Sequence, residues 1–158
     1  MTLGSIPVLQ RETALWDKIG DKLLSTEYDP RDLPIAEKKS IWLGMGMTEK
    51  QGGSDVRANE TFAKPIAKSG RGQAYLLTGH KWFFSAPMCD AHLVVAQTEH
   101  DGLACFFVPR WRENGEKNQV QVLRLKDKVG NRSNSSSEVE FKDAWGMMIG
   151  EAGRGIPT

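Results

Sequence analysis

Two short apolar runs, His92–Gln97 (HLVVAQ) and Leu103–Val108 (LACFFV), decide the fold prediction. The turn residues His100-Asp101-Gly102 lie between them. Runs of this length that are rich in β-branched and aromatic residues and bounded by turn residues are typical of paired strands. Short runs of this kind, separated by turn residues, continue from Ile41 onward, which predicts a mainly β fold, an antiparallel barrel or sandwich.

The other predicted strands lie outward from this pair in both directions along the chain. We expect them near Trp42–Thr48, Val56–Ala67, Gln73–Leu77, His80–Ser85, Val120–Lys126 and Ser136–Phe141. The last of these alternates between apolar and acidic residues, so Val139 and Phe141 are expected to point inward and the glutamates into water. A hairpin turn at Ser69–Gly72 and a longer loop at Pro109–Asn118 separate some of the strands.

The sequence before Ile41 has a different character. Apolar residues recur four and seven positions apart, which predicts one amphipathic helix over residues 8–24. These residues are Val8, Leu15, Ile19 and Leu23. The charged, proline-containing stretch Glu27–Ser40 predicts a linker. We therefore divide the chain into residues 1–40, a short helical segment with a linker, and residues 41–158, the β domain.

The composition fits one soluble domain. The chain has 158 residues, and 21 basic against 20 acidic side chains give no net charge that would favour nucleic acid or a membrane surface. No apolar run approaches the roughly 18 residues of a membrane span, and no secretory signal is present at the N-terminus. Cys89 and Cys105 are therefore expected to be reduced thiols in a cytoplasmic protein.

The stretch Gly44–Asp55 is the first candidate for a binding site. A predicted strand ends at Thr48, and Gly52, Gly53 and Ser54 follow. Paired glycines allow a positive φ, and successive N–H groups in such a turn suit a phosphate, to which Ser54 would add a hydroxyl. A tight turn that leaves a strand would need the same glycines, so the spacing leaves both interpretations open. The stretch is neither a P-loop nor a dinucleotide fingerprint.

The strand Gly79–Ala86 is the second candidate. Strict alternation would place Trp82 and Phe84 on one face and Phe83 and Ser85 on the other. One face would then belong to the core, while Phe83 would stack on a flat ligand ring with the Ser85 hydroxyl near the edge of that ring. A strand that is buried on both sides fits the same composition.

The remaining reactive residue types define no site. The histidines lack metal-ligand spacing and no CxxC or HxxxH occurs, so no metal is expected. Cys105 has apolar neighbours, as a core thiol would and a nucleophile would not. No Ser/His/Asp arrangement and no carboxylate pair stands out, so no catalytic residue is assigned. The charged turn Lys126–Ser133 carries no chemistry alone.

Taken together, these segments resemble the acyl-CoA dehydrogenase family. The middle domain of that family has a T-E-x-x-x-G-S-D turn, a G-x-K-x-W-type strand, an x-G-x-R-x-S turn and an E-x-x-F-x-D strand, in this order. The corresponding segments here are Thr48-Glu49 with Gly53-Ser54-Asp55, Gly79–Ser85, Gly130–Ser133 and Val139–Asp143. The amino-acid sequence is most similar to the AidB-type branch of adaptive-response flavoproteins, over about Leu24 to Ile156. The resemblance implies the middle β-barrel domain of such a protein.

In that family the corresponding turn borders FAD. The resemblance implies that Thr48 hydrogen-bonds the flavin ring and Ser54 the pyrophosphate, and that Phe83 and Ser85 replace a tryptophan and a threonine beside the ring. The implied cofactor contacts are Met45, Gly46, Met47, Thr48, Gly53, Ser54, Phe83, Phe84 and Ser85. Ser54 and Thr98 are also implied to lie near the acyl-CoA. The implied flavin site requires the corner after Thr48 and the strand that ends at Ser85 to lie together.

The implied chemistry is α,β-dehydrogenation of an acyl-CoA thioester. A carboxylate base removes the α proton while hydride passes to the flavin. The family carries this base in a C-terminal helical domain, which we expect to lie outside this sequence. The chain alone is then expected to bind FAD weakly, to be inactive and to associate as a homo-oligomer. An alternative is a non-catalytic flavin- and acyl-binding module linked to the DNA alkylation response, whose DNA contacts would depend on segments outside the sequence.

Overall fold

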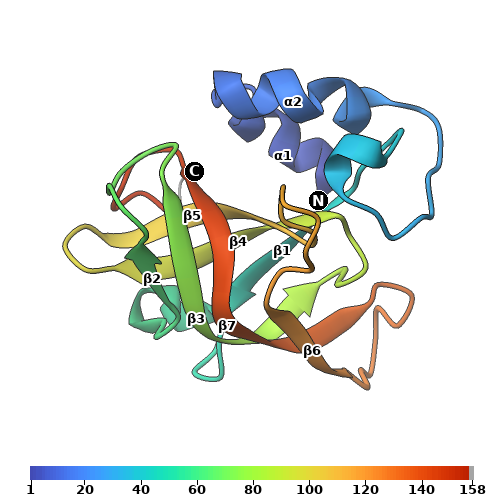
Figure 1. Cartoon of the computed structure of the whole chain (residues 1–158). Coiled ribbons are helices and arrows are strands. Elements are labelled where there is room, and N and C mark those ends of the chain that lie inside the picture. Colours follow the sequence, from blue (N-terminus) through green and yellow to red (C-terminus); the bar gives the residue numbers. More distant parts are fainter. Residues whose placement is uncertain (157–158) are drawn as a thin grey trace.

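The computed structural model describes residues 1–156, and Figure 1 shows helices α1 and α2 together on one side of a strongly curled sheet. The elements, in chain order, are α1 (Thr2–Leu9), α2 (Thr13–Leu24), the 3₁₀ helix η1 (Ile35–Glu37), β1 (Leu43–Thr48), the 3₁₀ helix η2 (Gly53–Ala58), β2 (Phe62–Pro65), β3 (Ala74–Ser85), β4 (Ala91–Thr98), β5 (Gly102–Pro109), β6 (Val120–Leu125) and β7 (Ser136–Ile149).

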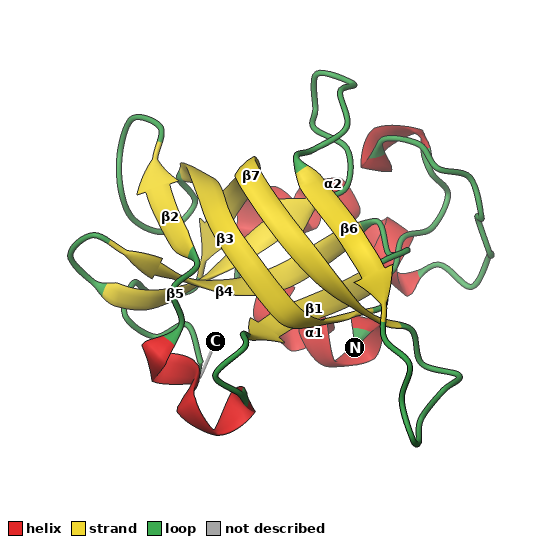
Figure 2. Cartoon of the chain, turned by 90° about the horizontal axis from the view of Figure 1, so that it is seen from below, coloured by secondary structure: helices red, strands yellow, loops and turns green. Residues whose placement is uncertain are grey.

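Strands β1, β3, β7, β5 and β4 close into a barrel. Each pairs with the next in this order, and β4 pairs back to β1. β2 joins β3 and β4, and β6 adds an outer strand to β7. Figure 2 shows β3, β7 and β6 side by side on the face away from the helices. The mainly β prediction is confirmed, but the sheet is mixed rather than antiparallel, because β1 and β2 run parallel to β4.

β3 and β7 are longer than the sequence predicts. The two strands predicted on either side of Gly79 form one strand, because Thr78 and Gly79 continue the pairing with β7. Gly79 has a φ of 147°, and a Cβ there would lie 2.6 Å from the Cα of Thr61. Glycine thus continues the strand where a side chain would collide with the neighbouring backbone. β7 likewise continues past Phe141 to Ile149.

The predicted strand Val56–Ala67 is wrong over its first part. That part belongs to η2, and the strand begins only with β2. Just before β2, the N–H groups of Glu60 and Thr61 donate hydrogen bonds to the carboxylate of Glu49, at 2.6 and 3.1 Å. A side-chain acceptor that takes these donors competes with a sheet partner, so the strand starts later than the apolar pattern suggests.

The barrel interior is packed with aromatic and aliphatic side chains. Tyr75 and Phe106 meet edge to face with ring centroids 5.1 Å apart, and Phe84 meets Phe141 in the same way at 5.9 Å. Further buried members of this cluster are Leu77, Val94, Ala104, Val108, Val139 and Met148. This close-packed core supports β3 from within along most of its length.

The N-terminal segment packs on the barrel as two helices, not as the single predicted helix. The break between α1 and α2 lies at Glu12, whose buried carboxylate accepts a hydrogen bond from the N–H of Gly150 at 2.7 Å. The apolar residues that the helices and the barrel share in one cluster include Leu9, Leu15, Ile19, Leu23, Ile41, Leu43, Phe107 and Ile149. The two helices and the barrel therefore share one hydrophobic core cluster.

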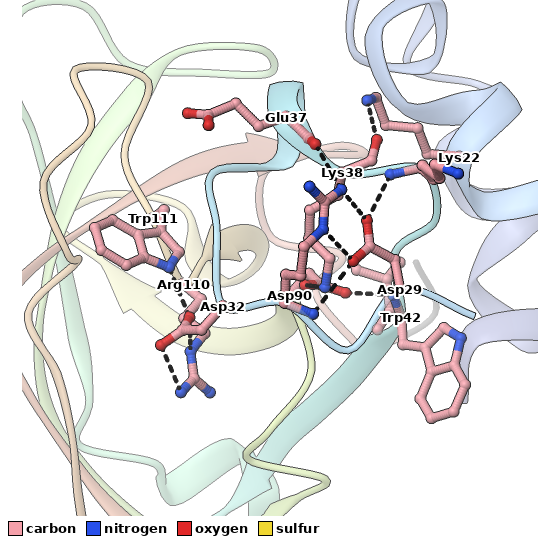
Figure 3. Close-up of polar contacts among 12 residues, drawn as sticks. Lys22, Asp29, Asp32, Glu37, Lys38, Trp42, Asp90, Arg110 and Trp111 are labelled. Carbon is pink, nitrogen blue, oxygen red and sulfur yellow. Dashed lines mark hydrogen bonds and ion pairs between the residues drawn. The ribbon is translucent and has the colours of Figure 1, made fainter. Parts of the chain in front are cut away.

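The segment between α2 and β1, predicted as a linker, is fixed by ion pairs (Figure 3). Asp29 accepts two hydrogen bonds from the guanidinium of Arg31, at 2.8 and 2.7 Å. The Nζ of Lys38 lies 2.5 Å from a carboxylate oxygen of Asp90, and both side chains are buried. Asp90 also accepts a hydrogen bond from the N–H of Trp42. These contacts hold the start of β1 beside β4.

Candidate functional site

The two candidate segments lie side by side in the sheet. β1 pairs with β3 so that Met45 lies opposite Ser85 and Thr48 lies opposite Phe83. The corner after Thr48 and the strand that ends at Ser85 therefore meet, as predicted. We call the surface formed by Met45, Thr48, Ser54, Phe83 and Ser85 the β1–β3 edge.

An irregularity in β3 decides which aromatic rings reach this edge. The pairing with β7 shifts register between Lys81 and Phe84, and these side chains are 0% and 1% exposed. Trp82 and Phe83, between them, both contact the ammonium of Lys126, which lies 3.3 and 4.7 Å from their ring centroids. The predicted alternation is therefore wrong. Trp82 lies with Phe83, because a bulge turns two successive residues outward.

Phe83 and Met45 supply the apolar surface of the edge, with 41% and 40% of their surface exposed. Phe84 instead stacks on His92 inside the barrel, with ring centroids 4.1 Å apart. A Cβ on Gly46 would lie 2.5 Å from the ring of Phe84. Two of the implied flavin contacts, Gly46 and Phe84, thus serve the packing behind the edge.

The corner after β1 needs its two glycines for different reasons. Gly52 has a φ of 101°, and no atom lies within 4 Å of the position of its missing Cβ, so the backbone angle alone requires glycine. A Cβ on Gly53 would lie 3.3 Å from the hydroxyl oxygen of Thr48. The next residue, Ser54, is exposed in η2. Gly53 thus lets the backbone of the corner lie close to the Thr48 hydroxyl, with Ser54 exposed beside it.

The hydroxyl groups near the edge differ in what they bind. Among residues 1–156, the hydroxyls of Thr48, Ser54 and Ser85 have no hydrogen-bond partner. The hydroxyl of Thr98 donates to a carbonyl of its own turn at 2.9 Å and accepts from an N–H at 3.2 Å. The first three are available to a ligand, whereas Thr98 closes the turn between β4 and β5.

A buried ion pair ties the corner to β3. The Nζ of Lys81 lies 2.7 Å from Oε1 of Glu49, with the side chains 0% and 7% exposed. Burial raises the pKa of Glu49, but hydrogen bonds from Lys81, Thr61 and Glu60 outweigh burial and lower that pKa overall. Burial lowers the pKa of Lys81 against the opposing effect of Glu49. The carboxylate therefore stays charged at neutral pH and joins β1, β3 and the start of β2.

Sequence reasoning missed Glu49, Lys81 and Asn59 as supports of the corner. The amide of Asn59 donates to the carbonyl of Met47 at 2.7 Å, just before Thr48. A partial signal was present in the sequence. A lysine inside an apolar strand is unusual, and a buried ammonium requires an acidic partner, for which Glu49 after the preceding strand was a candidate.

A small cluster of charges packs on the ring of Trp82 and touches one side of Phe83, whose ring otherwise stays exposed. Oε1 of Glu138 accepts hydrogen bonds from Arg124 and Lys126, both at 2.8 Å. These hydrogen bonds, from Arg124 first, lower the pKa of Glu138 to about 2. The prediction that the glutamates of β7 point into water is therefore wrong for Glu138, which is buried beneath the charged residues in and after β6.

His92, on β4, is buried directly behind the edge. Its Nε2 lies 2.9 Å from the carbonyl oxygen of Ala86. Burial lowers the pKa of His92 from 6.5 to about 4, against the opposing effect of this hydrogen bond. The folded protein thus binds this proton less readily than the unfolded chain does. Its stability therefore rises with pH between about 4 and 6.5 and is level above that range.

We expect the free energy of unfolding to be about 2 kcal/mol lower at pH 5 than at pH 7 through His92 alone. Urea unfolding measured across this range tests the prediction, and His92→Gln is expected to remove that part of the slope. His100→Gln, at a side chain that is 81% exposed, is the matched control and should keep the slope. An unaltered slope in His92→Gln would contradict the prediction.

A cavity of about 460 Å³ lies beside the turn of Thr98, with Arg57, Gln97, Asp101 and Gly102 in its lining. Arg57 belongs to η2, as does Ser54, so one short element joins the cavity to the edge. The edge itself is open. Four of the better-formed cavities in residues 1–156 are lined by residues other than Thr48, Ser54 and Phe83.

Other reactive groups are placed for structure. Among residues 1–156, no group of three or more His, Cys, Asp or Glu side chains is arranged to hold a metal. Cys89 and Cys105 are free and buried, and burial raises the pKa of their thiols to about 11 and about 12. Neither is therefore a nucleophile at neutral pH.

Within residues 1–156, no helix is long and apolar enough to cross a membrane.

Known sequences match this chain along nearly its whole length. Residues 44–144 match the family model described as acyl-CoA dehydrogenase, middle domain. The chain is 51% identical to the AidB protein of Escherichia coli (strain K12), over 99% of this chain and 28% of that protein. It is 34% identical to acyl-CoA dehydrogenase family member 11 of Caenorhabditis elegans, over 99% of this chain and 26% of that protein.

Solved structures agree with these matches. Caenorhabditis elegans ACDH-11 in complex with C11-CoA has a TM-score of 0.75 at 31% identity, over 99% of this chain and 26% of that one. Butyryl-CoA dehydrogenase from Megasphaera elsdenii has a TM-score of 0.62 at 23% identity, over 78% of this chain and 32% of its own, and supports the fold alone. This chain spans about a quarter to a third of these relatives. It belongs to the acyl-CoA dehydrogenase family, whose middle domain it carries.

Proposed function

We propose that this chain forms one wall of the FAD and acyl-CoA site of an oxidoreductase that dehydrogenates acyl-CoA thioesters between the α and β carbons. The pairing of β1 with β3 carries the proposal, because it puts the hydroxyls of Thr48 and Ser85 on one edge with the exposed ring of Phe83. A flavin has a flat ring with a polar rim, and this edge offers an aromatic surface beside hydroxyls that have no internal partner.

The residues of the edge take separate roles in this proposal. FAD, when bound, would supply the hydride acceptor. Thr48 and Ser85 would hydrogen-bond the polar rim of the flavin, and Phe83 would cover its ring and exclude water. Ser54 and the N–H groups of the corner would bind the pyrophosphate. Met47 packs beneath the corner beside Val56 and would support it. No residue between 1 and 156 is assigned as the base.

We place the anionic part of acyl-CoA in the cavity beside Thr98. Arg57 lines that cavity and lies in the same short helix as Ser54, and a guanidinium suits phosphate groups. C11-CoA is bound in the Caenorhabditis elegans relative, which supports this substrate class. Because the hydroxyl of Thr98 is engaged in its own turn, Thr98 would shape the cavity rather than bind through its side chain.

The purified 158-residue chain is expected to bind FAD weakly and to oxidise no acyl-CoA. Ligand sites bury about 70–90% of a small molecule, whereas the β1–β3 edge is an open surface, and each 1.4 kcal/mol of lost contact weakens binding about tenfold. Titration of FAD followed by flavin fluorescence measures the affinity. Reduction of an electron-accepting dye, compared with a flavin-only control, measures the activity.

Matched variants separate weak binding at the edge from binding elsewhere. Phe83→Ala is expected to weaken the residual FAD affinity further, whereas Ser133→Ala, at an exposed hydroxyl in the turn before β7, should leave it unchanged. Equal affinity in Phe83→Ala and the wild type would remove the edge as the flavin site. Stoichiometric flavin on the purified chain, or dye reduction above the control, would contradict the expected weakness.

The proposal extends to the surroundings of the domain. We take residues 41–158 as the middle domain and residues 1–40 as a helical segment with a linker. Homo-oligomer formation is part of the proposal, since the outer strand β6 exposes Val122, Leu123 and Leu125. A cytoplasmic location also belongs to it and is consistent with two free cysteines.

A further inference from the structure

A second polar cavity lies at the opposite end of β3 from the β1–β3 edge. Its volume is about 320 Å³, and its lining includes Val8, Arg11, Glu12, Arg71, Glu151 and Arg154. Arg71 lies three residues before Ala74, where β3 begins, whereas Phe83 lies near Ser85, where β3 ends. The cavity is therefore separate from the β1–β3 edge, and nothing in the proposed dehydrogenation uses it.

Three arginines reach this cavity from three parts of the chain. Arg11 lies between α1 and α2, Arg71 in the β2–β3 hairpin, and Arg154 in the turn after β7. Figure 1 shows this hairpin and the C-terminal end of the chain close together below the helices. Within residues 1–156, two acids, Glu12 and Glu151, line the same cavity, so the formal charge of this lining is positive. Converging like charges repel, and a bound anion would relieve that repulsion.

Glu12 leaves Arg71 partly exposed and Arg11 unpaired. Glu12 is committed on both oxygens, to Nε of Arg71 at 3.0 Å and to the N–H of Gly150 at 2.7 Å. Arg71 also donates from its Nη2 to the carbonyl oxygen of Arg11, so its guanidinium is held in a fixed orientation while the side chain remains 47% exposed. Arg11 makes no side-chain hydrogen bond or ion pair among residues 1–156. Arg154 pairs with Glu151 at 3.8 Å.

We propose that this cavity binds a phosphate group, as inorganic phosphate or as a phosphomonoester. Guanidinium groups present planar forks of donors that match phosphate oxygens, and an oriented fork loses little freedom on binding. Arg71, fixed by Glu12 and by the carbonyl of Arg11, offers its remaining oriented donors, those of Nη1, and Arg11 supplies the unpaired charge. Val8 forms an apolar wall on which the organic part of a monoester would rest.

Phosphate titrations of the full chain at constant ionic strength, followed by ³¹P NMR, test the site. Arg11→Gln is expected to weaken phosphate binding at least about tenfold, the loss of one charge-assisted hydrogen bond, without unfolding the protein. Arg112→Gln is the matched control, because it removes one partly exposed arginine that pairs with Glu116 and does not line the cavity, and it should change nothing. Glu151→Gln removes a competing negative charge and should strengthen binding a few-fold. Phenyl phosphate, if it binds more tightly than inorganic phosphate, identifies a monoester as the natural ligand.

The opposite results would remove the site. Equal affinity in the wild type, Arg11→Gln and Arg112→Gln, with all three folded by circular dichroism, would show that phosphate is held only by general charge. Complete competition by chloride at equal concentration would lead to the same conclusion. Ser54→Ala provides a further separation, since it should leave this binding intact, and a loss there would move the phosphate to the β1–β3 edge.

Discussion

Replacing Lys81 by methionine is expected to lower the free energy of unfolding by about 3–5 kcal/mol. Lys81 is fully buried and its Nζ lies 2.7 Å from the carboxylate of Glu49. Methionine retains much of the apolar stem, so packing changes little, but a buried carboxylate then keeps only the N–H groups of Glu60 and Thr61. Urea unfolding at neutral pH measures the loss.

A double variant isolates the charge from the packing. Glu49→Gln combined with Lys81→Met buries no charge, so much of the lost stability should return. Lys142→Met, at a lysine side chain that is 60% exposed, is the matched control and should cost little. If Lys81→Met were as stable as the wild type, the pair would not anchor the corner, and Thr48 would owe its position to another contact.

Gly44→Ala is expected to cost about 3 kcal/mol, because it overpacks the point where β1 joins two strands. A Cβ there would lie 2.4 Å from the carbonyl oxygen of Ser85 and 2.4 Å from the ring of His92. The first neighbour is backbone and the second is a buried ring, so neither gives way easily. Thermal and urea unfolding both measure the effect, and retained flavin affinity in a folded variant would show that only packing is affected.

Gly4→Ala is the matched control for this substitution. Gly4 lies in α1, and no atom comes within 4 Å of its missing Cβ. Alanine there should stabilise the protein slightly, by about 0.5 kcal/mol, because it favours the helix and restricts the unfolded chain. Tolerance of alanine at both positions would contradict the close three-strand junction at Gly44.

Local patterns in the sequence predicted much of the fold. The runs His92–Gln97 and Leu103–Val108 form the neighbouring strands β4 and β5, because a short turn limits them to antiparallel pairing. The parallel pairing of β1 with β4 joins residues far apart in sequence, and no local spacing records it. The break at Glu12 between α1 and α2 was missed for a similar reason, since Gly150, its partner, lies near the other end of the chain.

The location of the candidate site followed from motif order, but its detailed surface did not. Thr48 and Phe83 lie opposite each other as their motifs required. Which aromatic ring faces outward depends on the bulge between Lys81 and Phe84, and that bulge depends on burial of the Lys81 side chain against Glu49. A strict period of two cannot predict such an insertion, because the contact that accompanies it joins β3 to the corner after the neighbouring strand β1.

The position of β7 in the ring has a consequence for synthesis of the protein. β7 is the last of the strands among residues 1–156 and joins β3 to β5, so the ring stays open until Ile149 has emerged from the ribosome. Until then the apolar lining of the nascent barrel remains accessible, and we expect chaperones to bind it at that stage. Closure then occurs late and over long sequence separations, which is the kind of step that makes folding slow.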